Sequence, residues 1–122
     1  MTRPVASLPD DLRSQIIGHC LAEFPNEGCG LLAVSGDVVV KVYPTANQDA
    51  SPTSYTIPPA QHYDALVDAE TQGWEIGGVF HSHPRGSATM SATDLERAIE
   101  PGWVYVVVGL GTGEPVLTVS SL

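Results

Sequence analysis

The segment VFHSHPRGSATMSATDLE, residues 79–96, contains two histidines separated by one residue. A serine and an aspartate three positions apart follow them. Side chains alternate faces along a strand, so His81 and His83 of one strand point the same way, with Cα atoms roughly 6.6 Å apart. Ser91 stands where a helix cap belongs, and Asp94 falls at the third helical position. We expect the loop between them, residues 84–90, to fold this helix start back over the end of the strand.

His81, His83 and Asp94 have the ligand count of a catalytic zinc site, in which three protein groups leave a fourth position for water. A structural zinc site would normally close all four positions. A catalytic zinc ion lowers the pKa of its water towards about 7 and polarises a carbonyl, so the pattern favours a hydrolase. The chemistry also needs a base for the water and a donor for the oxyanion, and Ser91 could be that donor.

The base should be a carboxylate outside the metal ligands, and Glu27 in FPNEGCGLL is a candidate. It directly precedes an expected core strand and is flanked by Pro25 and Gly28. A charged residue that opens an apolar strand is more often a solvated strand end. This segment alone therefore leaves the role of Glu27 open.

The other candidates also have ordinary structural interpretations. A lone histidine on a strand is more often a satisfied polar residue than a ligand, and Ser91-x-x-Asp94 is also a plain capping box, which contributes on the order of 1 kcal/mol. Cys29 shares a face with Glu27 if the strand has begun, but a buried, apolar cysteine is favoured over a thiolate near zinc. We interpret four more residues as outside the catalytic set: Ser82 as structural, His19 and His62 as surface or cap residues, and Asn47 as a loop residue within reach of substrate.

The elements that would position these residues alternate between helices and strands. A helix is expected to start after Ser7 and end before Pro25, and a second to run from Pro59 to about Gly73 with Tyr63, Leu66 and Val67 among its apolar positions. A third helix is expected at 91–100, and strands are expected at 29–34, 38–43, 54–57, 74–83, 103–109 and 116–120. This order predicts an α/β fold, a mixed sheet with helices packed on it.

Composition and charge restrict the class of protein. A chain of 122 residues fits one domain, residues 1–122. The net charge of −9 would repel a phosphate backbone, so a nucleic-acid partner is not expected. Two cysteines without CxxC spacing do not form a disulfide scaffold. We expect no secretory signal and no membrane span, and so a cytoplasmic protein.

The combined motif resembles that of the JAMM (MPN-plus) metallopeptidase family. It consists of His81-x-His83-Pro84, Ser91 and Asp94, with Glu27 upstream in a Pro-x-Glu-x-Cys-Gly-Leu-Leu context. The resemblance implies an α/β/α sandwich similar to cytidine deaminases and one zinc ion per chain, held by His81, His83 and Asp94. It also implies Glu27 as the acid/base that acts on a zinc-activated water, and Ser91 as the residue that stabilises the oxyanion.

The resemblance further implies cleavage at the C-terminal Gly-Gly tail of a ubiquitin-like or sulfur-carrier protein. The short chain favours a minimal prokaryotic type, as a monomer or homodimer. Two alternatives belong to other classes. The first is a non-catalytic MPN-type interaction module, which the complete catalytic signature argues against. The second is a zinc hydrolase of small molecules or cell-wall peptides, which stays open.

Overall fold

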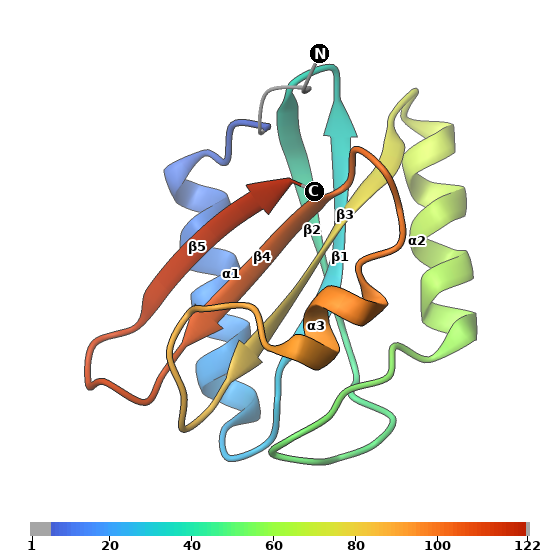
Figure 1. Ribbon diagram of the computed structural model, residues 1–122. Coiled ribbons are helices and arrows are strands. Elements are labelled where there is room, and N and C mark those ends of the chain that lie inside the picture. The colour runs from blue at the N-terminus through green and yellow to red at the C-terminus, as the bar shows by residue number, and fades with distance from the viewer. Residues whose placement is uncertain (1–5, 122) are drawn as a thin grey trace.

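Five strands form one mixed sheet, and helices cover both of its faces (Figure 1). The computed structural model describes residues 6–121. Its elements follow the order α1 (Asp10–Glu23), β1 (Cys29–Ser35), β2 (Val38–Thr45), α2 (Pro59–Thr71), β3 (Glu75–His83), α3 (Ala92–Arg97), β4 (Val104–Gly109) and β5 (Val116–Ser121). The strand order is β2-β1-β3-β4-β5, in which β3 and β4 are parallel and the other neighbours are antiparallel. The predicted α/β fold with a mixed sheet is confirmed.

Two apolar clusters hold the helices against the sheet. On one face α1 packs through Leu12, Ile16 and Cys20 against strand residues that include Phe80 and Val106. On the other face α2 contributes Ala65 and Ala69, and α3 lies on this same side (Figure 1). The central strand β3 is therefore enclosed between its neighbours and both layers, and its carboxyl end carries the two histidines.

The start of α1 and the buried face of α2 differ from the sequence-based expectation. Ser7 does not cap α1, because it forms a bridge with Val38, and Pro9 takes the cap position. On α2 the apolar residues Tyr63, Leu66 and Val67 face outward, because the helix turns its small alanines to the sheet. Tyr63 is the clearest case, since 66% of its surface is exposed.

Two segments next to the site are less regular than predicted. Residues 54–57 are extended but are not part of the sheet, because Thr56 bonds to the loop residues Asn47 and Gln48. The third helix ends at Arg97, three residues earlier than expected. Among residues 6–121, no helix is both long and apolar enough to cross a membrane.

Candidate metal centre

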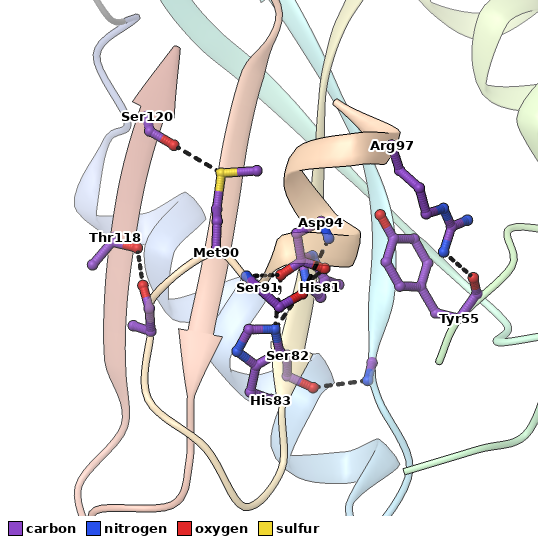
Figure 2. A network of polar contacts seen from close by, with 12 residues as sticks. Tyr55, His81, Ser82, His83, Met90, Ser91, Asp94, Arg97, Thr118 and Ser120 are labelled. Atoms are coloured by element: carbon purple, nitrogen blue, oxygen red, sulfur yellow. Dashed lines mark hydrogen bonds and ion pairs between the residues drawn. The ribbon is translucent and has the colours of Figure 1, made fainter. Parts of the chain in front are cut away.

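The two histidines lie at the carboxyl end of β3 with their side chains on the same side of the strand (Figure 2). His81 sits between Cys29 of β1 and Val107 of β4 in the strand register, and 4% of its surface is exposed. The Nε2 atoms of His81 and His83 approach to 3.2 Å. Strand alternation thus produces the convergence that the sequence predicts.

Asp94 reaches the same point from the first turn of α3. Ser91 caps this helix: its Oγ accepts a hydrogen bond from the Asp94 N–H at 3.1 Å, and the Asp94 carboxylate accepts one from the Ser91 N–H at 2.9 Å. The carboxylate oxygens also lie 3.0 Å from the Nε2 atoms of His81 and His83. The capping box therefore orients the carboxylate toward the histidines.

The donor set of His81, His83 and Asp94 fits a cation. Nδ1 of His83 lies 2.8 Å from the carbonyl oxygen of Ser87, an acceptor, so a His83 ring with a single hydrogen carries it on Nδ1 and presents a lone pair at Nε2. That lone pair and the Asp94 carboxylate are two acceptors in contact, which a shared cation would stabilise. Ligand atoms about 2.0–2.1 Å from zinc stand about 3.3 Å from each other in a tetrahedron. The observed separations of 3.0–3.2 Å are close to that value.

The carboxylate of Asp94 is held in its charged form. Burial alone would raise its pKa, but hydrogen bonds from His81 and from the Ser91 backbone outweigh burial and hold the pKa well below its usual range. Metal ligands must be deprotonated, so this environment suits a ligand.

Glu27 lines the same cleft, outside the group of three. Only 6% of its surface is exposed, and burial raises its pKa from 4.5 to about 7. Its backbone is fixed on both sides: its N–H donates to the Ser51 carbonyl at 2.9 Å, and its carbonyl accepts from Asn47 Nδ2 at 3.1 Å. A carboxyl group with a pKa near neutral can take up and release a proton under ordinary conditions.

The cleft around these residues has a volume of about 430 Å³. Its lining includes Glu27, His83, Ser91 and Asp94, together with residues 52–55 and 84–86. Because Ser91 Oγ accepts the bond from Asp94, its own O–H stays available to donate to a ligand in the cleft. The structure thus brings together all five residues that the sequence singled out.

Ser82, between the two histidines, fixes the position of Glu27. It is fully buried, its Oγ accepts a hydrogen bond from the Gly28 N–H at 2.8 Å, and its own N–H donates to the Gly28 carbonyl at 3.0 Å. The interpretation of Ser82 as structural agrees with these bonds. The residue next to the candidate base is therefore clamped to the strand that carries the histidines.

Tyr55 and Arg97 also belong to the site, and sequence reasoning did not single them out. The Tyr55 ring stacks on His81 with 4.8 Å between ring centroids. The Arg97 guanidinium lies 4.7 Å from the centre of the Tyr55 ring and donates to the Tyr55 carbonyl at 3.0 Å (Figure 2). The side chains of Arg97, Tyr55 and His81 form a stack that joins α3 to β3 through the segment that carries Tyr55.

The remaining candidates lie outside the group of ligand atoms. Cys29 is a buried free thiol whose Sγ contacts Thr45 and Ala46, and burial raises its pKa. The His19 ring bonds to the Thr45 carbonyl, whereas His62 is exposed on α2. The Asn47 side chain is used in bonds within its own loop and to Glu27, and it donates to the carbonyl of Ser54, which lines the cleft. Its Asn-x-Asp sequence, typical of an Asx turn, is the signal that could have indicated this.

Comparisons with known proteins agree on one family. A family model described as prokaryotic homologs of the JAB domain matches residues 9–119. A desampylase of Haloferax volcanii is 36% identical over 88% of this chain and 82% of its own length. A probable TtuB-protein conjugate cleaving protease of Thermus thermophilus is 36% identical over 77% of this chain and 64% of its length. A CysO-cysteine peptidase of Mycobacterium tuberculosis is 32% identical over 80% of this chain and 68% of its length.

Solved structures share the fold. A protein from Desulfitobacterium hafniense superposes with a TM-score of 0.80 at 34% identity, over 92% of this chain and 80% of its own. A JAB1/MPN domain protein from Archaeoglobus fulgidus has a TM-score of 0.64 at 18% identity, over 98% and 88%. A JAMM protein described as having a metalloprotease-like zinc site has a TM-score of 0.62 at 19% identity, over 97% and 88%. The last two likenesses concern the fold alone.

Proposed function

Because the chain belongs to the prokaryotic JAB family of JAMM metallopeptidases, we propose that it is a zinc-dependent hydrolase of ubiquitin-like or sulfur-carrier proteins. The scissile bond follows the carrier's C-terminal Gly-Gly tail. One relative is named a probable TtuB-protein conjugate cleaving protease, and another is named a CysO-cysteine peptidase. Transfer of this substrate class to the present chain is part of the proposal.

One observation carries the proposal: a metal-ligating group and a carboxyl group with a raised pKa share one cleft. His81, His83 and Asp94 converge on one point, with their ligand atoms within 4.8 Å of one another. Glu27 lines the cleft beside them but is not a member of that group. Three ligands with a separate acid/base match the catalytic rather than the structural type of zinc site.

Each residue has a distinct task in the proposed hydrolysis. A zinc ion held by His81, His83 and Asp94 would supply Lewis-acid polarisation of the carbonyl and lower the pKa of water. Glu27 takes a proton from the attacking water and gives it to the leaving nitrogen. Ser91 donates a hydrogen bond to the carbonyl oxygen as negative charge develops there. The water oxygen joins the acyl carbon, the C–N bond breaks, and the proton leaves with the amine.

The test uses a ubiquitin-like carrier protein with residues added after its Gly-Gly tail. We expect the zinc-loaded protein to remove the added residues, as a loss of mass that a chelator prevents and added zinc restores. Glu27→Gln should retain zinc by elemental analysis but lower the rate about 10²–10⁴-fold, the usual contribution of a positioned base.

Glu96→Gln is the matched control, because Glu96 is an exposed glutamate on α3 outside the cleft. It should cleave at the wild-type rate. If Glu27→Gln is as fast as the wild type, Glu27 is not the base. If no extended carrier loses mass in a chelator-sensitive way, the proposed function is wrong.

We also propose that residues 1–122 act as a single domain in the cytoplasm. Cys20 and Cys29 are both buried free thiols, which suits a reducing compartment. Fractionation of the native host cell tests the location, since recovery outside the cytoplasm would contradict it.

A further inference from the structure

Positive charge is concentrated at the cleft of an otherwise acidic protein. The chain has 5 basic and 14 acidic residues. Arg85 and Arg97, two of these five basic residues, line the cleft that holds Glu27 and the metal ligands. They stand on different segments: Arg97 ends α3 beside Tyr55 (Figure 2), and Arg85 lies in the loop that follows β3.

The two arginines differ in whether their charge is already used. The Arg97 guanidinium is engaged by the ring and the carbonyl oxygen of Tyr55. Arg85 is exposed and forms no hydrogen bond or ion pair with any residue in the described range 6–121. Arg85 is therefore the cleft cation whose five N–H donors are available to a ligand.

The backbone of the loop that carries Arg85 is hydrogen-bonded to the proposed metal ligand His83. Gly86, next to Arg85, donates to the His83 carbonyl at 3.3 Å and accepts from the Gly111 N–H at 3.1 Å. Gly111 packs so closely on the Arg85 backbone that a Cβ at position 111 would clash with it.

The rest of the loop is attached in the same way. The Ser87 carbonyl bonds to Nδ1 of His83, and a Cβ at Gly109 would clash with the backbone of Ser87 and Ala88. The Arg85 backbone is thus anchored beside the ligand group, and Arg85 is an exposed residue of the cleft lining.

From this arrangement we propose that Arg85 binds the α-carboxylate of the leaving group, so that the bond cleaved joins the carrier's terminal glycine to the α-amine of a single amino acid. The inference rests on the proposed function and specifies its bond. In such an adduct the carboxylate is attached to the carbon that bears the scissile nitrogen, next to the reacting centre. A guanidinium recognises a carboxylate through two parallel N–H···O bonds.

An isopeptide bond to lysine presents different chemistry at this place. There the scissile nitrogen is bonded to a methylene carbon, and the lysine's own carboxyl carbon is five bonds beyond that methylene and is part of a peptide bond. Arg85 would then have no carboxylate partner at this place, and its charge would add nothing to binding of the leaving group. The free cation therefore favours an amino-acid adduct over a protein conjugate.

The experiment compares three forms of one carrier. A single alanine follows its Gly-Gly tail with a free carboxylate in the first form and a terminal amide in the second, and the third has the tail on the ε-amine of a peptide lysine. We expect the zinc-loaded wild type to cleave the carboxylate form with a kcat/KM about 10–100-fold above that of the amide form, as for a hydrogen-bonded charge pair. It should cleave the lysine form no faster than the amide form.

Arg85→Gln should abolish the preference, so that the kcat/KM values for the carboxylate and amide forms become equal. Arg85→Lys should keep part of the preference, because it retains the charge but not the planar fork. Arg13→Gln, which removes a charge on α1 far from the cleft residues, should keep the full preference. Calorimetric binding to the zinc-loaded Glu27→Gln protein should give the same ratio between the carboxylate and amide forms as Kd values.

The outcomes separate the two proposals. Equal cleavage of the carboxylate and amide forms, an unchanged preference in Arg85→Gln, or faster cleavage of the lysine form would each overturn the role of Arg85 and leave the hydrolase intact. Absence of cleavage of all three forms would count against the hydrolase itself, and the role of Arg85 would fall with it.

Discussion

The site is assembled from two halves that are held in place very differently. The sheet half consists of Glu27, His81 and His83, at the ends of β1 and β3. The helix half consists of Ser91, Asp94 and Arg97, on or next to the six-residue α3. His81 is enclosed by paired strands on both sides, whereas α3, which lies wholly within the described chain, has no buried residue. We infer that the fold fixes the sheet half, and that the helix half depends on the site's own bonds.

Substitution of one proposed metal ligand in each half gives the largest expected contrast. Asp94→Asn should lower zinc affinity at least about 100-fold, yet change the free energy of unfolding of the metal-free protein by less than about 1 kcal/mol. The substituted amide can still accept from the Ser91 N–H and can donate to Nε2 of His83. His81→Ala should lower zinc affinity as much and also cost about 2 kcal/mol or more, because it leaves a cavity in the sheet.

Denaturant titration of metal-free proteins and competition for zinc with a chromophoric chelator measure these two effects. Equal losses of stability in both variants would show that α3 is as integral to the fold as β3. Retention of about one zinc ion per chain in Asp94→Asn would show that Asp94 is not a ligand.

The pH dependence of Glu27 tests the sheet half by itself. Its pKa is raised to about 7, so the folded protein holds a proton that the unfolded chain releases near pH 4.5. The stability that protonated Glu27 supports is therefore complete below about pH 4.5 and is lost as pH rises through 7. Glu27→Gln has no such loss, so in metal-free protein its stability relative to the wild type should rise by about 1–3 kcal/mol between pH 4.5 and pH 8.

Thermal or urea unfolding at a series of pH values measures this change, with Glu96→Gln as the control at an exposed position. A difference between Glu27→Gln and the wild type that does not vary with pH would mean that the Glu27 carboxyl titrates normally.

The smallest expected effect concerns the attachment of the helix half. Arg97→Gln removes the guanidinium that holds the end of α3 to Tyr55. One hydrogen bond and one cation–π contact together stabilise by about 1–2 kcal/mol, so amide hydrogen exchange within α3 should accelerate about fivefold to thirtyfold. Exchange within β3 should be unchanged.

The exchange rate of α3 in Arg97→Lys should lie between those of the wild type and of Arg97→Gln, since lysine keeps a cation over the Tyr55 ring. Zinc affinity should fall in the same order as α3 exchange rises, because a looser α3 presents Asp94 less often. Acceleration in β3 as large as in α3 would contradict the division into two halves.

The sequence predicted the parts of the site that depend on local periodicity. The spacing of His81, His83, Ser91 and Asp94 follows from the alternation of a strand and the first turn of a helix, and the structure has this arrangement. Glu27 could be assigned a role only through the family resemblance, because its proximity arises from the pairing of β1 with β3.

Features that depend on tertiary packing were not predictable in the same way. Tyr55 joins the site by stacking across segments that are far apart in sequence. The apolar pattern on α2 pointed to the wrong face, because a helix that lies close to a sheet places small residues such as Ala65 and Ala69 at the contact. Hydrophobicity alone does not distinguish such close packing from a large apolar face.

The serine between the two histidines has a wider consequence for how this site is encoded. Ser82 faces away from the histidines and bonds to Gly28, which is 54 residues earlier and adjacent to Glu27. Three consecutive residues of one strand therefore include two candidate metal ligands and the serine that holds the candidate base in place. The short motif on β3 thus helps to set the distance between Glu27 and the two histidines. Because these bonds join the segment of Glu27 directly to β3, we expect that a change in the length of the loops around the cleft would leave that spacing unaltered.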